Sequence, residues 1–232
     1  MPPSAKPSRL AAVDIARHYH QQPYATLILE GGYEEAGDQG RFRVSAGDVL
    51  LHPAFSAHQD HVGAVRTTVL DLPLPFDGRA WPALARLKDP DPVIRSASRD
   101  SREAQEFLLD HLMPLIAAEH DEADQLAGVL TADPSTAIGD WASSQGYCRE
   151  SLSRRFTLLY GIDSARFRVE ARTRLAWRQI VSTDEPLAQI ASASGFADQA
   201  HMTRSVGRLT GRTPKAWRKI VTLVQEPAES AR

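Results

Sequence analysis

The sequence of 232 residues has little cysteine and no long apolar run. Its one cysteine, Cys148, excludes an intrachain disulfide and any metal site built from several cysteines. No stretch approaches the roughly 20 apolar residues of a membrane span, and prolines and charges occupy the start, where a secretion signal needs an apolar core. With 42% hydrophobic and 24% charged residues, we expect a soluble, cytoplasmic, globular protein with no membrane partner.

The net charge of -2 conceals an asymmetry along the chain. Residues 1–130 hold 12 Lys and Arg against 19 Asp and Glu, whereas residues 131–232 hold 15 against 10, so the two parts carry -7 and +5. In the second part 13 of the 15 basic residues are arginine, whose planar fork pairs with phosphate and with guanine. Charge alone leaves two interpretations open, a nucleic-acid partner and a solvated helical surface.

The first half has the pattern of a small β sandwich or barrel, with short apolar runs separated by glycine-bearing turns. These runs cover residues 24–29, 42–44, 49–52 and 65–70. Helical spacing of apolar residues over 107–116 then predicts a helix packed on the barrel or on a partner subunit. Residues 128–135, which contain Asp133 and Pro134, are typical of a hinge. We therefore predict two domains, 1–128 and 129–232.

The second half contains an internal repeat. The segment that starts at Gly146 aligns with the segment that starts at Gly195, with one extra residue in the second copy. In each copy a short helix is expected to end at the glycine, which supplies a left-handed turn, and an aromatic residue follows. The next helix has two inward apolar residues four positions apart and a polar outer face. This arrangement predicts two helix-turn-helix units.

Residues 164–181 lie between the two units and contain no proline or glycine. They predict one helix about 27 Å long. A spacer of that length could hold two recognition helices in successive major grooves of DNA.

A longer set of positions carries a family resemblance over residues 138–219. They are Ala142, Gly146, Leu152, Arg154, Phe156, Gly161, Arg172, Ala176, Ile190, Ala191, Gly195, Phe196, Arg204, Gly211, Thr213, Pro214, Trp217 and Arg218. The stretch resembles the DNA-binding domain of the AraC/XylS transcription regulators. Two positions depart from the family pattern: Val206 stands where phenylalanine is usual, and Cys148 where a capping serine is common. The resemblance implies an α+β chain with an N-terminal cupin-like β-barrel with packed helices and a C-terminal all-α double helix-turn-helix domain.

The candidate DNA-binding residues lie on the polar faces of the two predicted recognition helices, where glutamate can accept from cytosine and arginine can pair with guanine or phosphate. They are Arg149, Glu150, Ser153 and Arg154 in the first copy and Gln199, His201, Thr203 and Arg204 in the second. We expect Lys215, Arg218 and Lys219 to meet phosphate or solvent.

The first half also resembles a cupin in two short stretches. Gly47, Pro53 and His58 follow the spacing of the second cupin motif, although Phe55 replaces its usual glycine. Upstream, His18 and His20 match the first motif, in which Tyr24 occupies the usual glutamate position. The resemblance implies that His18, His20 and His58 could hold one divalent metal ion. It equally implies a metal-free cavity, because many regulators of this type have retained only the cavity. We rank His52 and His61 below these three as ligands.

We therefore predict a sequence-specific transcription regulator, not an enzyme, controlled by a small-molecule or metal effector in the cupin-like domain. Its partners would be double-stranded promoter DNA, the effector, a second copy in a homodimer and, for an activator, RNA polymerase. Two alternatives stay open: a metal-dependent cupin enzyme, and a ligand-independent regulator whose barrel only mediates dimerisation. The duplicated helix-turn-helix argues against the enzyme, and no phosphate loop or HExxH motif favours it.

Overall fold

The computed structural model describes residues 6–76, 80–116 and 121–225, with side chains up to residue 220. Its strands all lie before residue 115, and from residue 121 onward the described elements are helices. The predicted α+β class, with a β-rich N-terminal part and an all-α C-terminal part, is therefore confirmed. None of the described helices combines the length and the apolarity needed to cross a membrane.

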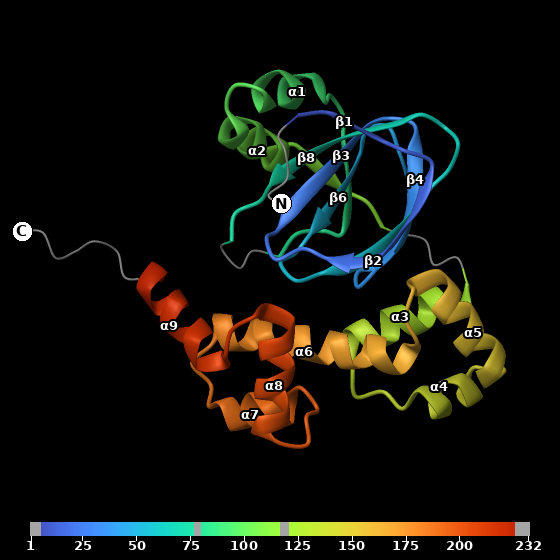
Figure 1. Cartoon of the computed structure of the whole chain (residues 1–232), viewed down its shortest axis with the longest axis vertical. Coiled ribbons are helices and arrows are strands. Elements are labelled where there is room, and N and C mark those ends of the chain that lie inside the picture. The colour runs from blue at the N-terminus through green and yellow to red at the C-terminus, as the bar shows by residue number, and fades with distance from the viewer. Residues whose placement is uncertain (1–5, 77–79, 117–120, 226–232) are drawn as a thin grey trace, which may run out of the picture. The chain divides into compact units, whose positions relative to one another are not determined.

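The strands form two antiparallel sheets rather than one closed barrel (Figure 1). The six-stranded sheet has the order β1 (Ser8–Leu10), β8 (Thr67–Pro73), β3 (Tyr24–Glu30), β6 (Asp48–His52), β9 (Leu84–Leu87) and β10 (Leu112–Pro114). The four-stranded sheet has the order β2 (Val13–Tyr19), β7 (Ala57–Val62), β4 (Gly32–Gly37) and β5 (Gly40–Ser45). We call these strands together with the two helices that follow β9 the β domain.

Both faces of the six-stranded sheet are covered, which explains why β3 and β6 are apolar along their length. Ala25 and Leu27 face a core that includes Val93 of α1 (Asp91–Ala97) and Leu108 of α2 (Ser101–Asp110). Ile28, on the opposite face, packs in a second core with residues of β5. Because side chains alternate along a strand, Tyr24 and Thr26 share the face of Ile28.

Several strands were not predicted. β2, β4, β7, β9 and β10 lack the runs of apolar or β-branched residues by which strands are recognised, and β4 contains two glutamates between turn glycines. The predicted helix over 107–116 is correct over 107–110, where Leu108 packs on the sheet, and wrong beyond: α2 ends at Asp110, Leu112–Pro114 is an edge strand, and Ile116 is fully exposed. Pro114 explains the difference, because proline interrupts helical hydrogen bonding.

The predicted hinge is also wrong over most of its length, because helix α3 (Glu122–Ala132) continues through Gly128. Only the turn from Asp133 onward separates α3 from the next helix, with the Asp133 carboxylate accepting from the backbone and hydroxyl of Ser135. Pro134 favours a turn at this point, because its ring fixes φ near the value that such turns need.

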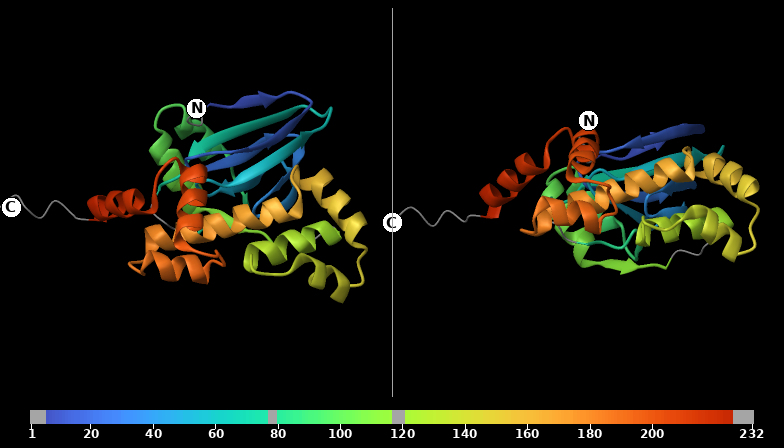
Figure 2. Two further views of the ribbon diagram at one scale, coloured as in Figure 1. Left: turned by 60° about the horizontal axis from the view of Figure 1, so that its bottom comes forward. Right: turned by 90° about the horizontal axis from the view of Figure 1, so that it is seen from below.

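The two predicted helix-turn-helix units are each confirmed. The first consists of α4 (Ile138–Ser144) and α5 (Arg149–Tyr160), and the second of α7 (Leu187–Ala193) and α8 (Gln199–Thr210), followed by α9 (Pro214–Gln225). Gly146 and Gly195 adopt left-handed φ values of 73° and 75°, as the repeat requires. The predicted spacer is one unbroken helix, α6 (Ser164–Ser182) (Figure 2).

The chain divides into two compact units whose limits differ from the predicted domains. The first unit contains residues 1–128 and 138–164, so α4 and α5 belong with the β domain. The second unit contains residues 129–137 and 165–232, with most of α6 and the second helix-turn-helix. The boundary at 128/129 and the spacing of α5 from α8 on DNA stay predictions.

Candidate ligand cavity and nucleic-acid interface

A cavity of about 1010 Å³ lies between the two sheets of the β domain. Its polar lining comes from both sheets: Tyr24, Thr26 and Asp71 from the six-stranded sheet, and His18, Tyr33, Glu35, His58 and Asp60 from the four-stranded sheet. Apolar side chains, among them Leu10, Ile15 and Val69, complete the wall. A mainly apolar cavity with a few convergent polar groups is the usual form of a small-ligand site.

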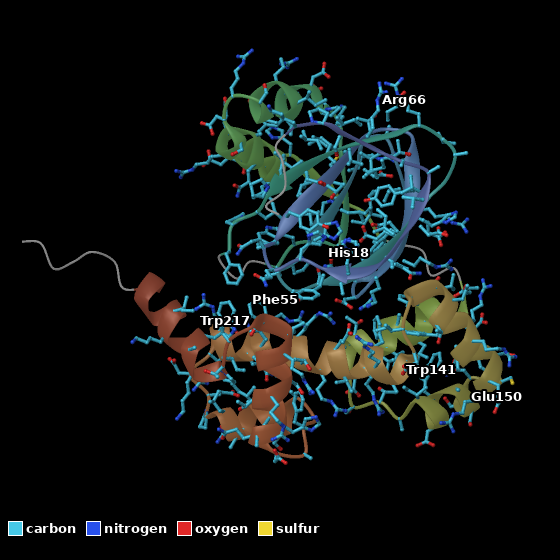
Figure 3. All side chains as sticks on the ribbon, viewed as in Figure 1. His18, Phe55, Arg66, Trp141, Glu150 and Trp217 are labelled. Atoms are coloured by element: carbon cyan, nitrogen blue, oxygen red, sulfur yellow. The ribbon has the colours of Figure 1, made fainter. Side chains whose placement is uncertain are left out.

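The three histidines predicted from the cupin resemblance lie together in this cavity. His18 and His58 are opposite each other in the pairing of β2 with β7, and their ring centroids are 4.5 Å apart. His20 lies 4.9 Å from His18, and one nitrogen from each of the three rings lies within 4.8 Å of the others. Figure 3 shows His18 among the strands of the β domain. The Tyr24 hydroxyl is 3.4 Å from Nε2 of His58.

A second group, which we call the Glu35 cluster, consists of Glu35, His52 and His58. Oε1 of Glu35 lies 3.6 Å from Nδ1 of His52 and 3.8 Å from Nδ1 of His58, and all three side chains are buried. Glu35 was not predicted from the sequence, and His52 ranked below the predicted trio. The available signal was the alternation Tyr33, Glu35, which places both residues on one face of a strand, once 32–37 is recognised as β4.

His61, the other lower-ranked candidate, lies outside the cavity. It is exposed and forms an ion pair with Asp14 on the neighbouring strand.

Glycine allows the strands that carry these groups to approach closely. Gly37 of β4 pairs with His58 of β7, and a Cβ at Gly37 would lie 2.8 Å from the Cβ of His58. Any larger residue there would push β4 away from β7 and separate Glu35 from His58.

Burial controls the charges in the cavity. It raises the pKa of Glu35 well above its usual range, with Asp60 and Asp71 adding repulsion, and it raises the pKa of Asp60 to about 7. Burial also lowers the pKa of His52 to about 3 and that of His20 to about 4, so both imidazoles are neutral at neutral pH. Several of these polar atoms have no hydrogen-bond partner in the described part of the chain, namely Nε2 of His20, Nε2 of His52 and Oδ1 of Asp60.

On α5, all four predicted DNA-binding residues are exposed: Arg149, Glu150, Ser153 and Arg154. Figure 3 shows Glu150 on the outer side of this helix. The inward pair Leu152 and Phe156 is buried, as the repeat predicts. Arg155 is turned differently, because its guanidinium donates to the Asp121 carboxylate at 2.7 Å.

On α8, Gln199 and Arg204 are exposed, whereas His201 and Thr203 are half-buried. The His201 ring packs edge-on against Phe196 with centroids 5.2 Å apart. The inward pair Met202 and Val206 is fully buried, so valine fills the position where phenylalanine is usual in the family.

The three basic residues expected near the C-terminus lie on α9. Lys215 and Lys219 are exposed, and the half-buried Arg218 donates a hydrogen bond to the Glu185 carbonyl.

A buried ionic group ties α5 to the β domain within the first unit. Arg41 of β5 donates to Asp124 at 2.9 Å, to Asp121 at 3.0 Å and to Glu34 at 3.2 Å. The Tyr160 hydroxyl at the end of α5 donates to Asp124 at 2.9 Å. We call these residues the Arg41 network. Glu34, Asp121 and Asp124 thus pair with a buried arginine of the same half. The negative net charge of the first half did not predict this pairing.

Comparison with known proteins matches residues 141–220 to a helix-turn-helix domain family. No curated protein matches the chain. Among solved structures, the chain is similar to unsaturated fatty acid-bound ToxT from Vibrio cholerae strain SCE256, with 11% identity over 96% of each chain and a TM-score of 0.44.

Two further similarities cover less than half of this chain. The DNA-binding domain of AdpA, solved with a target DNA, shares 20% identity over 46% of this chain and 97% of its own, with a TM-score of 0.41. An AraC-type regulator from Chromobacterium violaceum shares 21% identity over 46% of this chain and 91% of its own, with a TM-score of 0.39. The family match falls on the repeated unit built by α4, α5, α7 and α8. Residues 141–220 therefore belong to a helix-turn-helix domain family.

Proposed function

We propose that the chain is a DNA-binding transcription regulator of the AraC type. It would read promoter DNA through the exposed faces of α5 and α8, and a small molecule or a metal ion in the cavity would control its binding. The proposed control of DNA binding by a ligand rests on the position of β7. This strand lines the cavity with His58 and Asp60, and between them Gln59 makes hydrogen bonds to α5.

The contact from Gln59 reaches the last turn of α5. Its amide nitrogen donates to the carbonyl of Leu159 at 2.6 Å and to that of Leu158 at 3.3 Å. The last carbonyls of a helix have no partner within the helix, so a side chain that binds them positions the helix end. A ligand that moves His58 or Asp60 moves Gln59 as well, because all three belong to one strand.

The Arg41 network provides a second connection between the cavity wall and α5. Glu35 lines the cavity, and its neighbour Glu34 on the opposite face of β4 accepts from Arg41. Arg41 in turn binds Asp124, which accepts from Tyr160 of α5. Such a buried chain of charges has few alternative arrangements, so a shift of β4 is passed on as a shift of α5.

Effector control requires a ligand that binds one arrangement of α5 more tightly than another. Differential binding of about 1 to 3 kcal/mol would change operator affinity roughly 5- to 150-fold. Promoter specificity, a homodimer and a contact with RNA polymerase in an activator are further parts of the proposal. The enzyme alternative would use the same cavity and predicts turnover, whereas an effector is released unchanged.

The DNA-reading half of the proposal is tested with an operator selected from random sequence. We expect Arg154→Ala and Arg204→Ala each to weaken specific binding by about 1 to 3 kcal/mol if the arginine pairs with a base. The affinity of the unchanged protein should fall steeply with rising salt, because phosphate contacts release counterions. Fluorescence anisotropy over a salt series measures both effects.

The matched control is Arg102→Ala, which removes an exposed arginine of α2 whose guanidinium pairs with Glu106. It should leave operator affinity unchanged. If either recognition-helix variant binds the operator like the unchanged protein, that arginine does not contact DNA. If both do, the assignment of α5 and α8 as reading helices is wrong.

A further inference from the structure

The Glu35 cluster brings three ligand-type side chains together from three strands of both sheets. Glu35 comes from β4, His52 from β6 and His58 from β7, and one atom from each lies within 4.8 Å of the others. Only His58 belongs to the cupin-like trio. The cluster therefore has a geometry that neither cupin motif describes.

The distances within the cluster do not suit hydrogen bonds. An N–H···O hydrogen bond spans about 2.7 to 3.2 Å between heavy atoms. The Glu35 carboxylate oxygen lies 3.6 Å and 3.8 Å from the two imidazole nitrogens. Two ligand atoms at about 2.0 to 2.1 Å from a shared tetrahedral ion are roughly 3.4 Å apart. The observed separations are closer to those of atoms that share an ion.

The cluster is also costly without a ligand. Each of the three side chains is more than nine-tenths buried. Nε2 of His52, which is not the ring nitrogen closest to Glu35, has no hydrogen-bond partner in the described part of the chain either. Nearby, Oδ1 of Asp60 is buried without a partner too, and Nε2 of His58 lies 4.0 Å from Oδ2 of the same residue. Buried polar groups left without partners destabilise a fold, so such a concentration of them indicates a missing bound species.

We propose that Glu35, His52 and His58 bind one divalent first-row transition-metal ion. Two imidazole nitrogens and one carboxylate oxygen suit zinc and its neighbours, and they leave coordination positions open. Because Glu35 and His58 also line the cavity, these open positions are available to a ligand that enters it.

This inference deepens the proposed function by naming the chemistry of the effector site, and its regulatory meaning rests on that function. It also chooses between two ligand sets that share His58. In the alternative set, His18 and His20 replace Glu35 and His52, and both are less buried. Variants of the unshared residues separate the two sets.

The full chain is stripped of metal with a chelator. It is then titrated with Zn²⁺ by calorimetry and with Co²⁺ by visible absorption. One equivalent should bind, with a cobalt spectrum of nitrogen and oxygen ligands. Glu35→Gln keeps the shape of the side chain and should weaken Zn²⁺ more than about a hundredfold, since even loss of an outer supporting contact costs 10- to 100-fold. His18→Ala tests the alternative set and should change affinity less than about threefold. His61→Ala, which removes an exposed imidazole outside the cavity, is the matched control.

The expected fold of Glu35→Gln is checked by circular dichroism, and His52→Gln is a second variant should the first fail to fold. Absence of stoichiometric binding to the unchanged protein would overturn the site. So would retention of metal in Glu35→Gln together with its loss in His18→Ala, which would assign the ion to the other set. Operator affinity is measured in parallel with the metal-free and the metal-loaded protein. Normal DNA binding without metal binding rejects this site and leaves DNA reading intact. Metal binding with no operator binding in either state supports the site and rejects the proposed function.

Discussion

At the scale of single residues, Phe55 is the position under most backbone strain. It is the one non-glycine residue with positive φ among the described residues, at 62°, and it is buried. Its backbone N–H donates to the His20 carbonyl at 2.8 Å, so the turn between β6 and β7 holds the end of β2 in place. Burial of the aromatic ring favours phenylalanine at this position, although glycine would adopt the same backbone conformation without strain.

We expect Phe55→Gly to be more stable than Phe55→Ala by about 0.5 to 1 kcal/mol, the reverse of the usual order. Both variants lose the buried ring, at roughly 3 to 5 kcal/mol. Alanine keeps a Cβ in the left-handed region, where it costs about 1 to 2 kcal/mol, whereas the flexibility of glycine costs about 0.5 to 1 kcal/mol. Urea unfolding of both variants gives the order. An alanine variant equal to or above the glycine variant in stability would show that the turn is not strained.

Glu35 shows why single residues of the cavity were hard to predict. Its charge and its place between turn glycines predict an exposed loop, because isolated carboxylates are seldom buried. The structure buries it because strands from other parts of the sequence supply the imidazoles of His52 and His58, and Tyr33 on the same strand supplies a hydrogen bond. His18 and His20 were recognisable because a short local spacing carried the signal.

At the scale of elements, α5 and α8, the second helices of the two helix-turn-helix units, begin differently. Asp198 caps α8 by accepting from the backbone N–H of His201 at 2.6 Å. Cys148 occupies the same position before α5 and makes no such hydrogen bond; its thiol donates to Glu150 instead. The first turn of α5 therefore lacks the side-chain acceptor that its counterpart has.

Cys148→Ser should stabilise α5 by about 0.5 to 1 kcal/mol, because serine is a good capping acceptor. Amide hydrogen exchange in the first turn of α5 measures this directly. Cys148→Ala is the control, since it removes the thiol without offering an acceptor, and it should give no protection. Equal protection in the serine and alanine variants would mean that the thiol contact, not the missing cap, governs this helix end.

At the scale of the whole molecule, the first helix-turn-helix belongs to the same compact unit as the β domain. The Arg41 network accounts for this grouping. Its arginine side chain is only 4% exposed and contacts three carboxylates, two of which come from residues just before or within α3. Buried charges are tolerated only when paired, so the network depends on all its members.

Arg41→Met should destabilise the first unit by about 3 to 5 kcal/mol, because it removes the buried cation that contacts both Asp121 and Asp124. Arg43→Ala is the matched control on the same strand: this side chain is 70% exposed, and loss of its pair with Glu34 should cost less than about 1 kcal/mol. Thermal unfolding followed by tyrosine and tryptophan fluorescence compares them. Equal losses of unfolding free energy in the two variants would show that the Arg41 network does not hold α5 to the β domain.

The sequence by itself determined the helices and turns of the second half, because helix periodicity, turn glycines and the repeat are local signals. They do not depend on contacts with distant parts of the chain. Both glycine turns, the inward pairs and the continuous α6 follow from them. Only the tertiary structure decided the cavity and the grouping of α5 with the β domain. Those depend on which strands pair and on buried charges such as Arg41 and Asp124, 83 positions apart, and a sequence pattern carries no local trace of such contacts.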